Sequence, residues 1–459
     1  MGRYFYVDDQ EGNDLANGLS MDCAWKSLAA VNRMVFGAGD HICFKRGGKW
    51  QGMLSPSGSG RKFDKIVLEA YGEGECPEID GMGAYAAVLL EGVSNWLVKD
   101  LKVKNTANER AVRQGICVMG SPLGVTSGIE IQECEICGVM GENRRARDVY
   151  QSMYWNGGIY VSFPGRSDER NHLHDIIISN NYIHDVYTSG IRINQQEDFL
   201  NDIHHTHIVV RGNRIERTGS DGIIVANCIS PLITHNICLH AGALGSLEDT
   251  QLIAGIWVCA TSNALIERNE VGYTRLFEND GTAFDTDWGT AGDTIFQYNY
   301  THDNEGGFWL DCMKLNHNKD CGKTILRYNI SVRDGRGLAV YDQGMPVYWY
   351  GNAFYYEKPA EICLFDEGEN FLFESNVFCM EQEPIRGWQA CKYKNNVSRH
   401  TNCEEEASYT SWKALLKQVA EGVKEEHKKS SKKELDMLLG QITEGLCHLV
   451  KTKGQESLL

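Results

Sequence analysis

The chain has 459 residues, of which 42% are hydrophobic and 10% aromatic, enough to form a large folded core. Its formal net charge of −17 disfavours polyanionic partners, so we expect neither nucleic acid nor a membrane surface as a ligand. No window approaches the roughly 20 apolar residues of a membrane span, and residues 1–14 lack the apolar segment of a secretion signal, which predicts a cytoplasmic protein.

The 16 cysteines are scattered through apolar, strand-like segments such as those around Cys238, Cys259 and Cys363. This distribution is typical of reduced core thiols and not of a disulfide framework. Cys134 and Cys137 form a single CxxC pair without a second pair or a nearby histidine pair. Because a lone pair is a weak signal for zinc, no metal site is predicted.

An asparagine recurs through the middle of the chain at intervals of 20 to 33 residues. Each asparagine follows a β-rich segment, most precede a glycine-led apolar strand, and no helical periodicity separates them. A repeat of this length made of short strands predicts an all-β fold, the right-handed parallel β-helix, with one coil per repeat. We expect these asparagines to adopt the left-handed conformation at a tight corner and to stack their side chains. They are Asn181, Asn213, Asn236, Asn269, Asn299, Asn329, Asn352, Asn376 and Asn396.

Two segments depart from the repeat. Residues 139–173 are too long and polar for one turn, so we expect an inserted loop over a cleft of the 1–404 domain. Residues 405–459 turn rich in Glu, Lys and Leu, with apolar residues at i, i+3, i+4 and i+7, which predicts two amphipathic helices. These helices would cap the open end of the solenoid or join two copies of the chain in a homo-oligomer.

Two glycine-led strands, GTAFDTDW at 281–288 and GGFWLDCM at 306–313, carry aspartates among core-like residues. Aligning Gly281 with Gly307 turns Phe284 and Leu310 inward and Asp285, Asp311 and Trp309 outward. Asp285 and Asp311 would then lie one rung apart, at ~5 Å, with Asp287 further along the same face. Two carboxylates about 5 to 5.5 Å apart are the geometry of a retaining glycosidase.

Groups around these aspartates predict how a sugar would be held. Tryptophans supply flat apolar faces, and polar residues on the turns before the strands supply hydrogen bonds to hydroxyl groups. Two other readings stay open, namely a solvated acidic ladder and a calcium site made of Asp285, Asp287 and Asp311. The candidate substrate-binding residues are Trp257, Trp309, Trp288, Glu305, Asp280, His302 and Trp155.

These motifs resemble known enzymes. The opening YVDDQEGNDLANGLS and the later LEAYGEGECPEIDG resemble right-handed parallel β-helix carbohydrate-active enzymes over residues 3–400. DGTAFDTDW followed by IFQYNYTHDNEGGFWLDC resembles the catalytic region of glycoside hydrolase families 120, 136 and 141 from bacteria. Similarity to family 120 implies Asp285 as nucleophile and Asp311 as acid/base, where that family would have a glutamate. Similarity to family 136, whose members hydrolyse lacto-N-biose linkages, implies the seven-residue pair Asp280 and Asp287.

The sequence therefore predicts a retaining, exo-acting glycoside hydrolase of oligosaccharides that needs no cofactor. Asp285 attacks, Asp311 donates and later removes the proton, and Asp287 orients the pair or replaces one partner. A polysaccharide lyase with Arg192 or Lys314 as base is one alternative. A non-catalytic carbohydrate-binding β-helix is the other.

Overall fold

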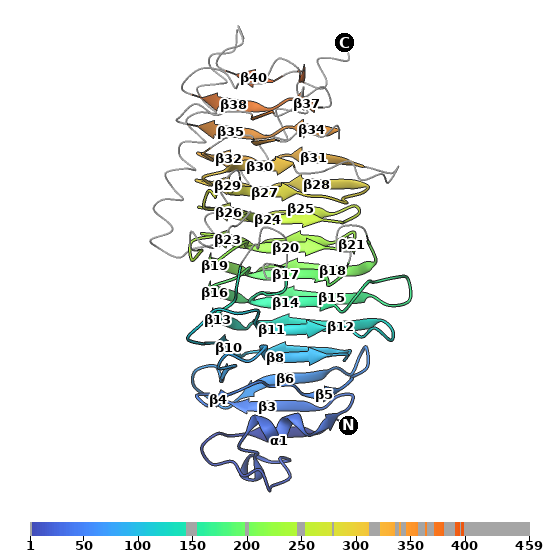
Figure 1. Cartoon of the computed structure of the whole chain (residues 1–459), viewed down its shortest axis with the longest axis vertical. Coiled ribbons are helices and arrows are strands. Elements are labelled where there is room, and N and C mark those ends of the chain that lie inside the picture. The colour runs from blue at the N-terminus through green and yellow to red at the C-terminus, as the bar shows by residue number, and fades with distance from the viewer. Residues whose placement is uncertain are drawn as a thin grey trace.

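The computed structural model is a right-handed parallel β-helix in which successive coils stack along one long axis (Figure 1). The structure describes residues 2–143, 154–197, 202–245, 253–277, 280–311, 322–335 and 346–356, together with 339–340, 363–364, 371–380, 391–394 and 396–398. The helical tail expected at 405–459, with its capping or oligomer contact, lies outside the described residues, as does Lys314. Within the ranges given, no helix is long and apolar enough to cross a membrane.

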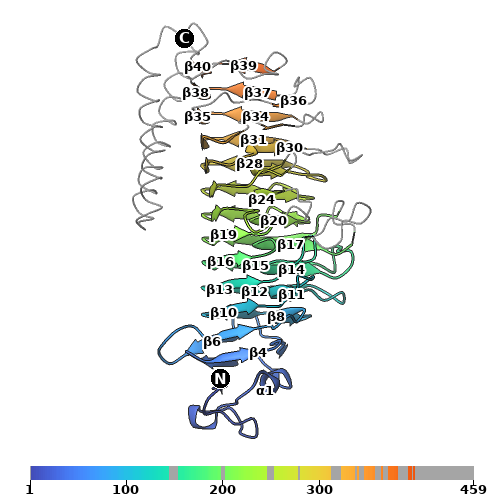
Figure 2. The same ribbon diagram turned by 60° about the vertical axis from the view of Figure 1, so that its left-hand side comes forward.

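Most coils contribute one strand to each of three parallel sheets, which Figure 2 shows from a second side. The largest sheet holds β1 (Tyr4–Val7), β3 (His41–Lys45), β6 (Ile66–Tyr71), β9 (Trp96–Lys99), β12 (Thr126–Gln132), β15 (Leu173–Ser179), β18 (His205–Arg211), β21 (Cys228–Ile229), β22 (Leu232–Thr234), β25 (Leu265–Glu267), β28 (Asp293–Gln297), β31 (Lys323–Arg327), β34 (Val347–Tyr350), β37 (Phe371–Glu374) and β39 (Lys392–Lys394).

The second sheet, of 13 described strands, holds β4 (Lys49–Gln51), β7 (Glu78–Asp80), β10 (Lys102–Asn105), β13 (Glu135–Val139), β16 (Tyr182–Val186), β19 (Arg214–Thr218), β23 (Ile237–Leu239), β26 (Glu270–Gly272), β29 (Tyr300–His302), β32 (Ile330–Val332), β35 (Ala353–Tyr356), β38 (Val377–Met380) and β40 (Val397–Ser398). The third, of eight described strands, holds β8 (Ala86–Glu91), β11 (Gln114–Met119), β14 (Ile159–Phe163), β17 (Ile191–Gln195), β20 (Ile223–Ala226), β24 (Ala254–Cys259), β27 (Thr282–Thr286) and β30 (Gly307–Asp311). Two short pairs, β2 (Val35–Phe36) with β5 (Ser57–Gly58) and β33 (Ala339–Val340) with β36 (Cys363–Leu364), and the helices η1 (Met21–Cys23) and α1 (Leu28–Asn32) complete the described elements.

The core runs the length of the solenoid as ladders of inward side chains. One ladder of the eight-stranded sheet joins Ile159, Ile191, Ile223, Ile256 and Phe284, all fully buried. Stacking identical phases of the repeat buries apolar surface continuously, which stabilises coils that could not form a core alone.

The asparagine ladder is confirmed, but its conformational role differs from the prediction. Asn269 Nδ2 donates to Asn299 Oδ1 at 3.1 Å and to the carbonyl of Ile233 at 3.0 Å, and the pattern repeats along the chain. The left-handed residue is the one before the asparagine, for example Arg268 with φ 54° and Tyr298 with φ 56°. The role of the asparagine itself is the bond that its amide donates to the next coil.

Two further predictions concern the 139–173 segment and the cysteines. The range 139–173 is not a single loop, because β14 (Ile159–Phe163) occupies a regular rung within it, while 144–153 lies outside the described residues. The ten cysteines whose side chains the structure describes are free thiols, and eight of them are buried. The expectation of reduced core thiols is therefore confirmed for that part of the chain.

Candidate active site

The aspartate-bearing strands β27 and β30 pair in a register that differs by one residue from the prediction. Thr282 lies opposite Gly307, which places Asp285 opposite Leu310 and Thr286 opposite Asp311. The cause is the double glycine of the second coil. Gly306 stacks on Gly281, to whose carbonyl its N–H donates at 2.8 Å, and a Cβ on Gly306 would lie 2.4 Å from the carbonyl carbon of Gly281. Gly306, and not Gly307, is thus the partner of Gly281.

This register turns Trp309 and Asp311 toward the interior phase. Trp309 is fully buried in the core and donates from Nε1 to Thr286 Oγ1 at 3.0 Å. Asp311 is also fully buried, at the end of an inward ladder that includes Val258 and Thr286. The outward positions predicted for Trp309 and Asp311 are wrong, and so is the inward position predicted for Leu310. The calcium alternative weakens for the same reason, because Asp311 does not share a face with Asp285 and Asp287.

Asp285 keeps its predicted outward position. It lies opposite Trp257 of β24, and the same outward ladder continues through Ile224, Arg192 and Tyr160. Asp287 extends this face by two residues, is partly exposed, and stays tied to β24 through its N–H bond to the carbonyl of Val258 at 2.9 Å. The two aspartates therefore point to the same side, ~7 Å apart along the strand.

Asp221 is a buried member of the site that the prediction missed. Its Oδ1 accepts from Trp257 Nε1 at 2.9 Å and from the N–H of Ala254 at 3.0 Å. Its Oδ2 accepts from Ser220 Oγ at 2.8 Å and lies 3.6 Å from the guanidinium of Arg192. Asp221 precedes Gly222 as Asp280 precedes Gly281, and this repeated Asp-Gly step was the signal that would have identified it.

Arg192 is fully buried on β17, three rungs from Asp285 along the outward ladder, with its guanidinium 5.4 Å from the ring centre of Tyr154. Tyr154 packs in one apolar cluster with Trp257 and Cys259, against which Trp155 also lies. The segment before β14 thus places two aromatic residues, Tyr154 and Trp155, in the cluster with Trp257.

Crowding of carboxylates sets the protonation of the site. Burial raises the pKa of Asp285 well above its usual value, and the charges of Asp287, Asp280, Asp311 and Asp221 raise it further. Burial also raises the pKa of Asp287, to about 6. The N–H of Trp288 donates to Asp287 Oδ1 at 2.8 Å, and this hydrogen bond offsets part of the increase in pKa. The raised pKa of Asp285 favours its protonated form, while Asp287, with a pKa of about 6, is mostly ionised at neutral pH.

The remaining predicted residues divide between the site and its surroundings. Asp280 is nearly buried on the turn before β27, where its charge acts on Asp285, and Trp288 directly follows Asp287. Glu305 is exposed on the turn before β30, where its carboxylate accepts from the N–H of Leu276 at 2.7 Å.

His302 belongs to another sheet. It is fully buried in β29, with Nε2 3.3 Å from Glu270 Oε1 and Nδ1 3.1 Å from Asp303 Oδ2. Burial lowers the pKa of His302, but the hydrogen bonds to Asp303 and Glu270 outweigh it and raise this pKa to about 9. The structure therefore gives His302 a buried ionic contact within the 13-stranded sheet and does not bring it to the aspartates.

The fold and the site together define a parallel β-helix whose eight-stranded sheet carries clustered carboxylates beside tryptophans. No family model matches the chain. It is 24% identical to a lacto-N-biosidase of Bifidobacterium longum subsp. longum over 82% of this chain, but the match spans only 29% of that relative.

Solved structures agree on the fold. Two crystal structures of a lacto-N-biosidase of glycoside hydrolase family 136 from Eubacterium ramulus superpose with TM-scores of 0.66 and 0.65, at 24% and 21% identity. They cover 84% and 86% of this chain and 68% of theirs. The resemblance of the chain to family 136 β-helix proteins is confirmed.

Proposed function

We propose that the chain is a glycoside hydrolase that releases lacto-N-biose from oligosaccharides. One observation carries the proposal: Asp285 and Asp287 have raised carboxyl pKa values beside Trp257, with Asp280 close enough for its charge to act on Asp285, on the sheet face where the predicted motif lies. Paired carboxylates with separated protonation states are what glycoside hydrolysis requires. The similarity to two lacto-N-biosidases supports the choice of sugar.

Asp287 is the proposed nucleophile. Its pKa of about 6 leaves it mostly ionised at neutral pH, and it is more exposed than Asp285. The carboxylate attacks the anomeric carbon while Asp280 protonates the leaving oxygen, and a covalent glycosyl-enzyme forms. Asp280 then removes a proton from water, which displaces Asp287 with net retention. This is the seven-residue pair that similarity to family 136 implied, in place of Asp285 with Asp311.

Asp285 and Asp221 support the pair without reacting. The raised pKa of Asp285 favours its neutral form, which limits the negative charge beside the nucleophile. Asp221 fixes the indole of Trp257 through its 2.9 Å hydrogen bond, and Arg192 supplies the counter-charge. Trp257 is thereby held in one orientation beside the carboxylates, as a preorganised site requires.

The first experiment follows hydrolysis of 4-nitrophenyl β-lacto-N-bioside and of oligosaccharides that end in lacto-N-biose. We expect free lacto-N-biose as the initial product, with the β-anomer seen first by NMR. An initial α-anomer would exclude retention, and release of a non-reducing-end fragment longer than lacto-N-biose would exclude the proposed exo action.

The second experiment separates the roles of the aspartates by azide rescue. Asp287→Asn should lower kcat by at least about 10³-fold, and azide should restore turnover with a glycosyl azide of inverted configuration. Asp280→Asn should give the azide of retained configuration, on substrates with activated leaving groups. Asp285→Asn should lose less activity than either, and Asp293→Asn on β28 serves as the control. Wild-type turnover by Asp287→Asn would overturn the assignment.

The two alternative functions make different predictions. A lyase needs an accessible base, but Arg192 is buried and faces Asp221. Elimination would yield an unsaturated product that absorbs in the ultraviolet, whereas a binding module would retain the disaccharide without turnover. Either result on the same substrates would replace the proposal.

A further inference from the structure

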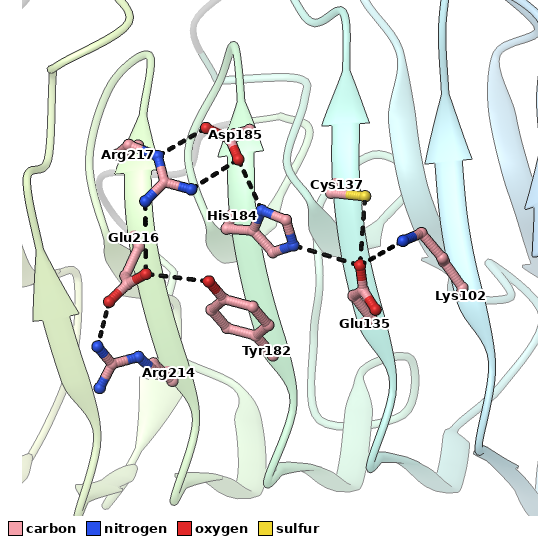
Figure 3. A network of polar contacts seen from close by, with 9 residues as sticks. All are labelled: Lys102, Glu135, Cys137, Tyr182, His184, Asp185, Arg214, Glu216 and Arg217. Atoms are coloured by element: carbon pink, nitrogen blue, oxygen red, sulfur yellow. Dashed lines mark hydrogen bonds and ion pairs between the residues drawn. The ribbon is translucent and has the colours of Figure 1, made fainter. Parts of the chain in front are cut away.

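A second group of chemically reactive side chains lies on the 13-stranded sheet, away from the eight-stranded sheet of the aspartates. Glu135, Cys137 and His184 place one carboxylate oxygen, one sulfur and one imidazole nitrogen within 4.8 Å of one another (Figure 3). Cys137 of β13 lies directly opposite His184 of β16, and Glu135 precedes Cys137 by two residues on the same face. Strand pairing therefore fixes the three donors on one rigid surface.

The CxxC spacing does not create this group. Cys134 packs in the core, with its Sγ 3.3 Å from the carbonyl oxygen of Gln132. Cys137 turns outward, and its Sγ lies 3.8 Å from Glu135 Oε1. The three donors come instead from adjacent coils, a relation that the sequence separation of 47 residues between Cys137 and His184 conceals.

The imidazole of His184 is oriented by a second layer of contacts. Its Nδ1 lies 2.7 Å from Asp185 Oδ2, and Arg217 holds Asp185 with two hydrogen bonds of 2.7 Å. Nε2 then faces Glu135 Oε1 at 3.4 Å. In many metal sites a carboxylate accepts the N–H of one imidazole nitrogen. This contact fixes the tautomer of the histidine and leaves the other nitrogen to bind the metal.

We propose that Glu135, Cys137 and His184 bind a zinc ion. Thiolate, imidazole and carboxylate together are ligands that Zn²⁺ accepts in a tetrahedral arrangement, whereas calcium and magnesium prefer oxygen alone. The side chains of Glu135 and His184 are 33% and 16% exposed, which leaves room for water as the fourth ligand. On binding, the thiol of Cys137 loses its proton to solvent, and the proton on Nδ1 of His184 stays in the bond to Asp185.

Lys102 is the group that competes with the ion. Its Nζ lies 2.6 Å from Glu135 Oε1, the same oxygen that faces His184 and Cys137. Metal binding displaces the ammonium group to Glu135 Oε2 or to solvent. Removing this positive charge while keeping every donor, as in Lys102→Met, should tighten binding.

Cobalt substitution tests the site on the full chain. After treatment with a chelator, titration with Co²⁺ should give a thiolate-to-cobalt absorption band at one equivalent, and Zn²⁺ should abolish it. Cys137→Ser and His184→Gln should remove the band, while Asp185→Asn should weaken binding by roughly 10- to 100-fold. Zn²⁺ should raise the Tm of the wild type and leave that of His184→Gln unchanged.

Matched variants keep the test decisive. Cys76→Ser removes another partly buried thiol and should leave the band intact. Lys102→Met retains all three donors and should bind Co²⁺ more tightly than the wild type. The proposal is overturned if neither the wild type nor Lys102→Met gives the band at one equivalent, or if the band persists in His184→Gln.

Discussion

Thr286 and Asp311 lie opposite each other on β27 and β30, while Asp285 lies opposite Leu310. This one-residue relation decides which carboxylates share the outward face. Asp311 ends an inward ladder and Trp309 fills the core beneath it, so the outward set is Asp285 and Asp287 with Asp280 at the preceding turn. The proposed acid/base, Asp280, therefore lies on the same coil as Asp287 and not one coil further along the solenoid.

The interior position of Trp309 predicts a loss of stability without a loss of substrate affinity. Trp309→Phe should lower the free energy of unfolding by about 1 to 3 kcal/mol, because Thr286 loses its donor and the core loses volume. Its KM should stay at the wild-type value. Trp257→Phe removes the hydrogen bond from the indole to Asp221 Oδ1, beside the nucleophile, and should change KM or kcat. Urea unfolding and steady-state kinetics separate the two, and a raised KM in Trp309→Phe would contradict the register.

The raised pKa of Asp287 predicts a pH dependence of stability. The folded state holds this proton up to about pH 6 and the unfolded state only to about its ordinary 3.8. The folded chain therefore binds more protons between these values, and its free energy of unfolding falls as pH rises from about 4 to about 6. Asp287→Asn should lack the part of this fall that Asp287 contributes, so the difference between variant and wild type should grow across the window. Thr290→Ala removes the 2.6 Å hydrogen bond from Thr290 Oγ1 to the carbonyl of Asp287 but changes no charge, so it should lower the whole curve without changing its pH slope.

The same pKa predicts the acidic limb of the pH–rate profile. If Asp287 attacks as the carboxylate, kcat/KM should rise with pH through about 6. Burial contributes most to the raised pKa of Asp287, and the charge of Asp221 raises it further, so Asp221→Asn should move the limb to lower pH. Ser220→Ala removes a hydrogen bond to Asp221 without changing its charge and should leave the limb in place. An unmoved limb in Asp221→Asn would exclude Asp287 as the titrating group.

Removing the negative charge of Asp221 should also destabilise the fold. Arg192 is fully buried and would lose its carboxylate partner, an effect worth about 3 kcal/mol or more. Replacing both residues, as in Arg192→Met with Asp221→Asn, should recover part of this loss in urea unfolding. A double variant less stable than the sum of the two single changes would show that the charges do not compensate each other.

The asparagine ladder predicts a large stability effect far from the site. Asn269→Ala removes the amide that bonds to Asn299 and Ile233 and the oxygen that accepts from Asn236. Buried groups left without partners cost about 1 to 3 kcal/mol each, so the free energy of unfolding should fall by about 3 kcal/mol or more. Asn17→Ala on the N-terminal surface should change it by less than about 0.5 kcal/mol. Equal effects would contradict the structural role of the ladder.

Much of this architecture was readable in the sequence. The recurring asparagines identified the coils, and the alternation around Phe284 placed Asp285 outward. These features depend on patterns within one coil, where strand periodicity alone decides which side a residue faces.

The predictions that were wrong depended on how one coil stacks on the next. Either Gly306 or Gly307 could align with Gly281, and the sequence does not distinguish these two registers. Only the close approach of Gly306 to Gly281 in the structure selects one of them. Asp221, Arg192 and Trp257 come from three successive coils, and so do not appear together in any motif. The sequence by itself determined the solenoid, because its repeat buries apolar surface only when coils stack. The tertiary structure alone decided which carboxylates meet, because a shift of one residue moves a side chain from the surface to the core.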